Sequence, residues 1–290
     1  MSAIDRGHVS SLSSHCTKTA VPIITLLTDF GTSDSYVAQM KGVLLTACST
    51  CQLIDITHQI PPQDILSGSR ILAEAALRFP PGTIHIAVVD PGVGTDRPII
   101  AVALAGHQFV LPDNGLLSHL LSQHPLDCAV QVTNVPLAQP SISCTFHGRD
   151  IIAPAAAHLA LGGKLSDLGP ATQRLHRCQL PTPERLSDGI GWHCPIIAVD
   201  HYGNLALGSC QELLSQIRQS LRVEVETACS VRQPAIVVDT YGQQAAGQLI
   251  MLVDSQCRLE LAQVNGSALK LLKVKSGDFM KIWPVLGICP

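Results

Sequence analysis

The chain has 290 residues, of which 46% are apolar and 14% charged, a composition typical of globular proteins rather than disordered ones. Its net charge is −3, and it contains only two Trp, three Tyr and five Phe, which argues against a nucleic-acid groove with clustered cations and stacking rings. We therefore expect no nucleic-acid partner, and the length allows two domains with separate cores.

The start of the chain and the cysteines bear on its location. Residues 1–20 are polar and lack the apolar centre of a signal peptide, and no apolar run is long enough to span a bilayer. The eleven cysteines are odd in number and scattered. These features predict a cytoplasmic protein with reduced thiols and no membrane partner. Cys48 and Cys51 form a C-x-x-C pair without a second pair at ligand spacing, so we interpret them as buried thiols and expect neither metal nor cofactor.

The first half alternates strand-like and helix-like segments, which predicts a three-layer α/β domain with a largely parallel sheet over residues 21–177. Helices are predicted where apolar residues recur at helical spacing and where Pro, Gly or Gly-Gly then stops the pattern. The predicted strands cover residues 22–31, 52–58, 83–90, 98–106 and 107–115, and the predicted helices cover residues 33–47, 63–79 and 150–163.

The second half has a different character. Residues 178–191 are rich in Pro, Gly and charge, as is typical of a linker. Short strands separated by turn residues follow, with one helical piece at 210–220, and this pattern predicts a small, mainly antiparallel β domain over residues 192–290. Its predicted strands cover residues 194–200, 221–227, 234–241, 248–254, 258–264 and 279–285.

Several apolar strands end in an aspartate followed by a glycine-containing turn. In open α/β sheets, ligands bind at the carboxyl ends of the strands. Asp113, in the sequence PDNG, is better explained as ordinary turn chemistry. Asp29 and Asp90 each follow a fully apolar strand, so we interpret both as site residues. Asp200 ends a strand of the second half in the same way.

The turn TFHGRD is a second candidate feature. It places His147 and Arg149 directly before a predicted helix, with Asp150 as the expected N-cap. Helix N-termini offer unpaired amide donors to polar ligand groups. Taken alone, however, His147 is equally typical of a structural histidine.

Arg97 follows Asp90 across a Pro-Gly-Val-Gly turn and either faces this site or pairs with Asp96 as a surface charge. The chain contains no G-x-S-x-G, Walker, G-x-G-x-x-G or H-E-x-x-H motif at a suitable place. A carboxylate, a guanidinium and an imidazole without a protein nucleophile are suited to holding and polarising water. The residues alone therefore indicate either a binder or a hydrolase of a small, polar, cationic ligand. The inferred ligand charge rests on the carboxylates expected at this edge, Asp29, Asp34, Asp90 and Asp200.

The chain resembles the S-adenosyl-L-methionine (SAM) hydroxide adenosyltransferase family, which is related to fluorinating and chlorinating enzymes. That family hydrolyses SAM to adenosine and methionine by attack of water or hydroxide at C5′ of the ribose. The resemblance implies a C-terminal β-barrel-like domain and a homotrimer with active sites between one subunit's N-terminal domain and a neighbour's C-terminal domain. The matching motifs are TDFGTSDSYVAQMKG, DITHQIPPQDILSG, VVDPGVGTDRPI, PDNGLLS, TFHGRDIIAPAAAHLA, DHYGN and LELAQVNGSA.

The resemblance also implies roles for individual residues. It assigns the water-handling carboxylate, guanidinium and imidazole to Asp90, Arg97 and His147, and the ribose diol to Asp29, because a carboxylate accepts hydrogen bonds from two hydroxyls. The remaining positions matched to substrate binding are Asp34 and Asp200 at the amino-acid end, Tyr202, Asn204 and the NGSA segment at 265–268, with Ser267 and Ala268, at the adenine, and Thr145, Phe146, Gly148 and Ser255 elsewhere in the pocket.

The leading hypothesis is SAM hydrolysis, with two alternatives. One is halide transfer to form a 5′-halo-adenosine, and the other is SAM or adenosine binding without catalysis. Gln63 stands where the halogenating relatives carry tryptophan, and Gly148 where the fluorinating enzymes carry serine, so halide is disfavoured as nucleophile. Gln256 replaces an arginine that holds the ligand carboxylate in the fluorinating enzymes, which leaves open how this chain binds that group.

Overall fold

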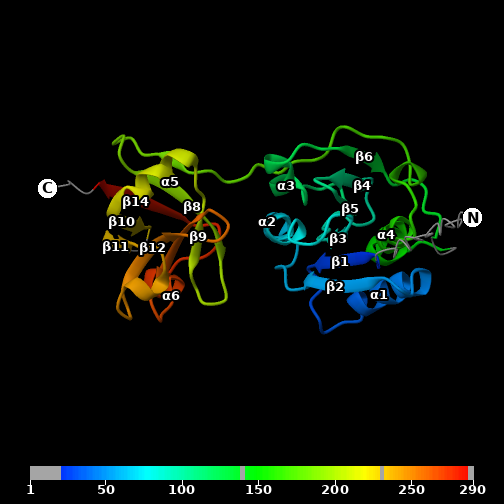
Figure 1. Ribbon diagram of the computed structural model, residues 1–290, viewed down its shortest axis with the longest axis horizontal. Coiled ribbons are helices and arrows are strands. Elements are labelled where there is room, and N and C mark those ends of the chain that lie inside the picture. Colours follow the sequence, from blue (N-terminus) through cyan, green and yellow to red (C-terminus); the bar gives the residue numbers. More distant parts are fainter. Residues whose placement is uncertain (1–20, 138–140, 229–231, 287–290) are drawn as a thin grey trace, which may run out of the picture. The chain divides into compact units, whose positions relative to one another are not determined.

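The computed structural model describes residues 21–137, 141–228 and 232–286, so the polar tail predicted at residues 1–20 lies outside the described residues (Figure 1). Contacts within the chain divide it into two compact units. The first comprises the segments up to Pro62, Phe79–Asp113 and Pro125–Gln173, and the second comprises Gln63–Arg78, Asn114–His124 and the chain from Arg174 onward. The domain boundary predicted at residues 178–191 stays a prediction.

The first unit is built on a six-stranded sheet with the order β2-β1-β3-β5-β4-β6. Strands β2, β1, β3 and β5 run parallel, whereas β4 and β6 are antiparallel to their neighbours. All five residues of β3 are buried, a run without alternation that is typical of parallel sheets. The predicted α/β class with a largely parallel sheet is confirmed. The strands are β1 (Ile23–Thr28), β2 (Gln52–Thr57), β3 (Ile84–Val88), β4 (Ile99–Leu104), β5 (His107–Pro112) and β6 (Cys128–Gln131).

Helices α1 (Tyr36–Ala47) and α4 (Ala153–Ala160) pack on each other and on this sheet. Met40 and Leu44 of α1 share a core with the alanines of α4 and with apolar side chains of β1 and β3. The predicted helix at 33–47 thus begins three residues later than expected. Helix α2 (Ile65–Ala76) packs on α3 (Ser118–Gln123) and begins after Asp64, whose carboxylate caps it by accepting the Ser67 N–H at 2.9 Å.

Buried polar side chains join three neighbouring strands of the sheet. The hydroxyl of Thr25 on β1 lies 2.7 Å from Nδ1 of His85 on β3, and Nε2 of His85 lies 3.1 Å from Nδ1 of His107 on β5. The His85 ring stacks on Phe109 with 4.9 Å between ring centroids. Burial, and then the charge of His107, lower the pKa of His85 to about 3, so this ring stays neutral in the folded protein near neutral pH.

We expect the free energy of unfolding to fall as the pH drops from about 6.5 toward about 3. In this window the unfolded chain protonates His85 and the folded protein does not, whereas above it the residue is neutral in both states. Each unit of pKa difference corresponds to about 1.4 kcal/mol. Urea unfolding of the wild type and of His85→Gln across this window measures the effect. The variant should lose stability less steeply, and equal slopes would contradict the assignment.

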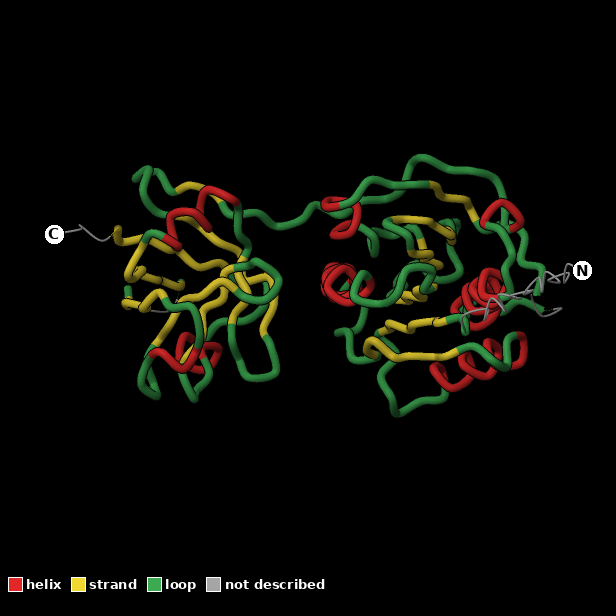
Figure 2. The backbone as a smooth tube through the Cα atoms, in the orientation of Figure 1, coloured by secondary structure: helices red, strands yellow, loops and turns green. Residues whose placement is uncertain are grey.

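The second unit contains a closed β-barrel (Figure 2). Seven strands follow one another in the order β14-β10-β11-β12-β13-β9-β8, and pairing of β14 with β8 closes the ring. Every pairing in the ring is antiparallel except that of β11 with β12, so the predicted antiparallel character is confirmed. The elements are β7 (Glu184–Arg185), β8 (Trp192–Val199), β9 (Leu205–Leu207), α5 (Gln211–Arg218), β10 (Ser220–Thr227), β11 (Gln233–Val237), β12 (Leu249–Val253), β13 (Leu259–Gln263), α6 (Ala268–Leu272) and β14 (Phe279–Leu286).

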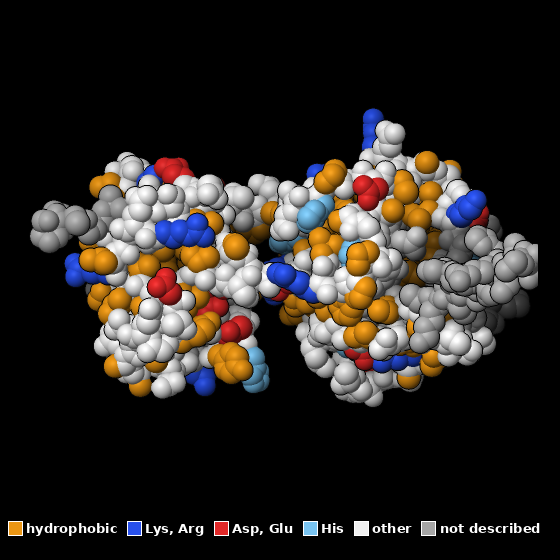
Figure 3. All heavy atoms as spheres, viewed as in Figure 1, with side chains coloured by type: hydrophobic (Ala, Val, Ile, Leu, Met, Phe, Trp, Pro, Cys, Tyr) orange, Lys and Arg blue, Asp and Glu red, His pale blue; other side chains and the backbone are white. Residues whose placement is uncertain are grey.

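The structure bears on the predicted buried thiols, on membrane-spanning helices and metal sites, and on the distribution of basic side chains. Cys48 and Cys51 are buried, and burial is the main cause that raises the pKa of Cys51, to about 11. Among the described residues no helix is long and apolar enough to cross a membrane, and no group of three or more His, Cys, Asp or Glu is placed to hold a metal. On the face in Figure 3, Lys and Arg side chains are scattered rather than gathered into a stripe.

Candidate active site

Two of the predicted carboxylates lie at the same edge of the sheet. Thr28, the last residue of β1, pairs with Val88, the last residue of β3, and the Asp29 N–H approaches the Val88 carbonyl at 3.4 Å. Asp29 follows β1 directly and Asp90 lies two residues beyond β3. The parallel pairing of β1 and β3 therefore places both carboxylates at the carboxyl ends of neighbouring central strands, as the sequence predicted.

Arg97 pairs with Asp90 and not with Asp96. Its Nε lies 2.7 Å and 2.9 Å from the two carboxylate oxygens of Asp90, and Nη2 makes a further contact to Oδ2. The side chains of Arg97 and Asp90 are only 11% and 4% exposed. A forked, largely desolvated pair of this kind fixes both groups in one orientation. The surface-charge alternative for Arg97 is therefore wrong.

Arg97 also contacts His147, which joins the three predicted water-handling residues. Nη2 of Arg97 lies 3.0 Å from Nδ1 of His147. Because a guanidinium only donates hydrogen bonds, Nδ1 must accept, and the proton of the neutral ring sits on Nε2. Burial, and then Arg97, lower the pKa of His147, which favours this neutral form. His147 is thus a hydrogen-bond donor through Nε2. Its unprotonated nitrogen, Nδ1, already accepts from Arg97 and is not free to take another proton.

Gly94 brings the Asp90–Arg97 loop against the segment that carries His147. It has a φ of +79°, and a Cβ atom at this position would lie 2.6 Å from the carbonyl oxygen of Cys144. A side chain here would meet both backbone strain and a clash with a neighbouring backbone. Gly92 differs, since its added Cβ would make ordinary contacts of 3.4 Å with Arg97 Cγ. Of the two glycines in the Pro-Gly-Val-Gly turn, Gly94 is therefore the one that allows the Asp90–Arg97 loop to lie against the backbone at Cys144.

The segment after His147 starts as a π-helix at Gly148–Ile152 and continues as α4, with the Ala153 N–H bonded to the Gly148 carbonyl. The prediction that Asp150 is an N-cap is wrong, because Asp150 lies inside the wide turn. Its buried carboxylate accepts the Ser143 N–H at 2.8 Å and pairs with Arg149. The hydrogen bond from Arg149 is the main cause that lowers the pKa of Asp150. Asp150 therefore ties the first turn of this helix to the loop that precedes His147.

Aromatic side chains lie next to His147. Phe146 is buried and makes edge-to-face contacts with Phe30 and Tyr36, at 5.8 Å and 5.2 Å between centroids. Phe30 follows Asp29 directly, so this cluster connects the two strand-end features. A Cβ on Gly148 would lie 3.3 Å from Sδ of Met40, which leaves little room for a larger residue. The other predicted residues of this unit, Asp34 and Thr145, are exposed in the loops that precede α1 and the π-helix.

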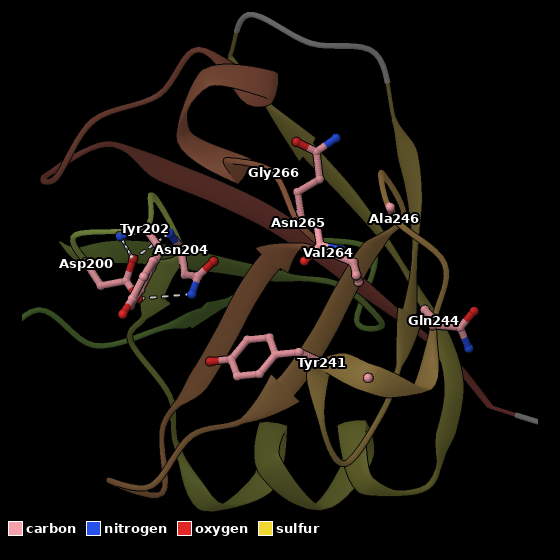
Figure 4. A pocket seen from close by; sticks show the side chains of 11 residues that line it. Asp200, Tyr202, Asn204, Tyr241, Gln244, Ala246, Val264, Asn265 and Gly266 are labelled. Carbon is pink, nitrogen blue, oxygen red and sulfur yellow. Dashed lines mark hydrogen bonds between the residues drawn. The ribbon is translucent and has the colours of Figure 1, made fainter.

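The second unit contains a pocket of about 640 Å³ at one side of the barrel (Figure 4). Its lining includes the predicted residues Asp200, Tyr202 and Asn204, together with Asn265 and Gly266 of the predicted segment 265–268. In Figure 4 the hydroxyl end of Tyr241 points toward the side formed by Asp200 and Asn204. The remaining lining residues are Gly242, Gln244, Ala246, Gln263 and Val264.

Asp200 organises one wall of this pocket. Its Oδ1 accepts the N–H groups of Tyr202 and Asn204 at 2.9 and 2.8 Å, and its Oδ2 accepts the Asn204 side-chain amide at 3.0 Å. Such an Asx-type turn holds the loop in one conformation. The Asp200 carboxylate therefore has a structural role that sequence reasoning did not predict, and Oδ2 keeps acceptor capacity for a ligand.

Three other predicted residues of this unit do not line the pocket. Ser267 caps α6 by accepting the Lys270 N–H, and Ala268 is buried in the first turn of that helix. Ser255 lies exposed in the turn between β12 and β13. In the same turn, Arg258 is held by Asp254, with 2.8 Å between Nη2 and Oδ2.

Sequence reasoning missed the pair formed by Tyr241 and Glu260. The Tyr241 hydroxyl donates to the Glu260 carboxylate at 2.5 Å, and Glu260, on β13, is only 8% exposed. Burial is the main cause that raises the pKa of both the Tyr241 phenol and the Glu260 carboxyl group. The available signal was an acidic residue between Leu259 and Leu261 in an otherwise apolar strand, since charged residues are rarely buried without a partner.

Two protein-family models match this chain. Residues 24–169 match the model of the SAM hydroxide adenosyltransferase N-terminal domain, and residues 194–281 match that of the C-terminal domain. The chain belongs to the SAM hydroxide adenosyltransferase family. The first matched segment includes Asp90, Arg97 and His147, and the second includes Asp200 and Asn204.

Similar proteins of this family carry two different names. A protein of Salinispora tropica named (R)-S-adenosyl-L-methionine hydrolase is 41% identical over 90% of this chain and 97% of its own length. A Thermus thermophilus protein with the same name is 34% identical over 88% and 96%. A fluorinase of Actinoplanes is 30% identical over 63% of this chain and 70% of its own length. A crystal structure of a conserved protein from Thermotoga maritima, 32% identical, superposes with a TM-score of 0.83 over 90% of this chain and 99% of that one.

Proposed function

We propose that this member of the SAM hydroxide adenosyltransferase family hydrolyses SAM to adenosine and L-methionine. The observation that carries the proposal is the contact of Arg97 with both Asp90 and His147, the latter 50 positions further along the chain, at the sheet edge that also carries Asp29. The names of the hydrolase relatives support the same reaction, at 34% and 41% identity over most of the chain.

In the proposed mechanism, these three residues hold one water molecule. His147 donates from Nε2 to the water oxygen, and Asp90 accepts a water hydrogen with the capacity that its contacts to Arg97 leave. The positive charge of Arg97 favours the anionic form of the bound water, and so stabilises the nucleophile as its proton is removed. Because Nδ1 of His147 is occupied by Arg97, Asp90 rather than His147 receives the proton.

The reaction replaces one bond at C5′ of the ribose. The water oxygen forms a bond to C5′, the bond from C5′ to the sulfonium sulfur breaks, and its electron pair stays on methionine as a neutral thioether. One water proton is released, so SAM and water give adenosine, methionine and a proton. The leaving group needs no general acid, and orientation of the nucleophile can contribute up to about 7–11 kcal/mol.

Substrate binding is assigned by the same proposal. Asp29 takes the ribose diol, Asp34 and Asp200 take the ammonium end, and the pocket with Asn204 takes the adenine. Gly148 lacks the hydroxyl that the resemblance associates with a halide contact, so water is the proposed nucleophile. The site of this reaction is cytoplasmic in our proposal, as expected from the sequence.

Hydrolysis in water enriched in ¹⁸O tests the proposed reaction. We expect adenosine that carries the label in its 5′-hydroxyl, because the water oxygen becomes that hydroxyl. The same incubation with added chloride, analysed for 5′-chloro-adenosine, checks the halide alternative. Unlabelled adenosine would exclude the mechanism, and tight binding without any product would favour a binding protein.

We further propose a homotrimer in which the first unit of one copy and the second unit of a neighbour form each active site. Two inactive variants, Arg97→Ala and Asn204→Ala, alter opposite halves of such a site. Co-expression of the two should then restore roughly a quarter of wild-type activity, because mixed trimers contain sites with two intact halves. Trimers of the expected mass without restored activity would place each site within one chain.

A further inference from the structure

The motif DITHQIPP has no part in the proposed reaction, yet its histidine contacts the tip of β1 and its aspartate contacts that histidine. Nδ1 of His58 lies 2.8 Å from the Thr28 hydroxyl. Nε2 of His58 lies 3.1 Å from Oδ1 of Asp55, an ion-pair distance whose geometry does not meet the criteria of a hydrogen bond. Thr28 is fully buried and His58 is 5% exposed. Thr28 directly precedes Asp29, the proposed ribose ligand.

The protons along this chain of contacts have one consistent arrangement. The Asp55 carboxylate only accepts, so the proton of a neutral His58 ring sits on Nε2 and Nδ1 accepts from the Thr28 hydroxyl. The Thr28 oxygen in turn accepts the Phe30 N–H at 3.2 Å. Lys41 donates to Asp55 at 2.6 Å on the outer side.

The backbone of His58 makes a second contact, with the turn that contains Asp29. Its backbone carbonyl accepts the Gly31 N–H at 2.8 Å, and Gly31 has a φ of +67°. Asp29 is therefore bracketed, with Thr28 held by the His58 ring on one side and Gly31 held by the His58 carbonyl on the other. A turn fixed at both ends leaves the carboxylate between them few orientations.

We propose that Asp55, His58 and Thr28 form a positioning relay that orients Asp29 toward the ribose diol of the substrate. The relay residues are positioning and not catalytic, because Thr28 is sealed from solvent and cannot touch a substrate. The inference rests on the proposed function, since it concerns how that substrate is selected.

The test compares Thr28→Val, which removes only the hydroxyl, with Thr25→Val. Thr25 is a matched control on the same strand, because it is equally buried and its hydroxyl contacts Nδ1 of another histidine, His85, at 2.7 Å. The measurement is the dissociation constant for adenosine and for 2′,3′-dideoxyadenosine, with thermal unfolding recorded for each variant.

We expect Thr28→Val to weaken adenosine binding about tenfold and dideoxyadenosine binding less than twofold, because only adenosine has the diol that Asp29 would hold. Thr28→Ser should restore adenosine binding, and Thr25→Val should leave both dissociation constants near wild type despite a similar loss of unfolding temperature. Asp29→Asn should remove any further effect of Thr28→Val, since coupled residues are not additive.

Two outcomes would overturn the relay while the proposed function stands. In both, the wild type produces labelled adenosine. In one, Thr28→Val weakens the two nucleosides equally, which indicates a general structural loss, and in the other it weakens neither. A wild type that neither binds adenosine nor hydrolyses SAM would overturn the proposed function and the relay together.

Discussion

Replacing Arg97 by lysine should lower the turnover number for SAM by about two to three orders of magnitude, while the dissociation constant for SAM changes only a few-fold. The guanidinium contacts both carboxylate oxygens of Asp90 and Nδ1 of His147 at once. A lysine keeps the charge but is a point donor without this planar fork. The water would then lose its orientation in the transition state, whereas substrate contacts elsewhere remain.

Single-turnover kinetics and calorimetric SAM binding separate the two effects. Arg222→Lys is a control for the same chemical change, because Arg222 lies on β10 with 59% of its side chain exposed. A loss of binding as large as the loss of turnover would show that Arg97 holds substrate rather than water. Full activity of Arg97→Lys would remove the fork from the mechanism.

Gly94→Ala should also abolish most activity, by a different route. The residue has a φ of +79°, where an added Cβ costs about 1–2 kcal/mol, and that Cβ would lie 2.6 Å from the Cys144 carbonyl oxygen. To relieve the clash, the Asp90–Arg97 loop must move away from the His147 segment. We expect turnover to fall at least about a hundredfold, because small displacements of a catalytic group have effects of this size.

Gly92→Ala is the matched control within the same turn. Its added Cβ would sit 3.4 Å from Arg97 Cγ, an ordinary contact, so turnover should stay within a few-fold of wild type. Steady-state kinetics and thermal unfolding of both variants compare the two glycines. Equal behaviour of the two would mean that the close approach of the loop to Cys144 does not position Arg97.

The sequence alone predicted the edge of the sheet at which the site lies. Asp29 and Asp90 each end an apolar run, and a parallel pairing of such strands brings their carboxyl ends together. The meeting of Arg97 with His147 could not be derived in this way, because spacing contains no information on how two loops approach. The resemblance to a family supplied that expectation, and the structure places the two side chains 3.0 Å apart.

Other features had weak local signals. Strand β6 and helix α3 are short and depend on tertiary contacts more than on periodicity, and neither was predicted. Asp150 has the sequence context of an N-cap, but the π-helix takes the preceding residues into the helix and directs its carboxylate to Ser143. Tyr241 and Glu260 lie nineteen positions apart along the chain, and they meet because β12 pairs with both β11 and β13.

The wide turn at Gly148–Ile152 has a consequence for natural and engineered variants. A turn of this kind contains one residue more than an α-helical turn, so a single deletion within it would leave a regular helix behind. Such a protein would keep its core alanines in place, yet its imidazole would rotate by about one residue's step, roughly 100°, away from the guanidinium. A deletion of one residue here would therefore remove activity while the protein stays folded, whereas a point substitution in the core would lower its stability as well.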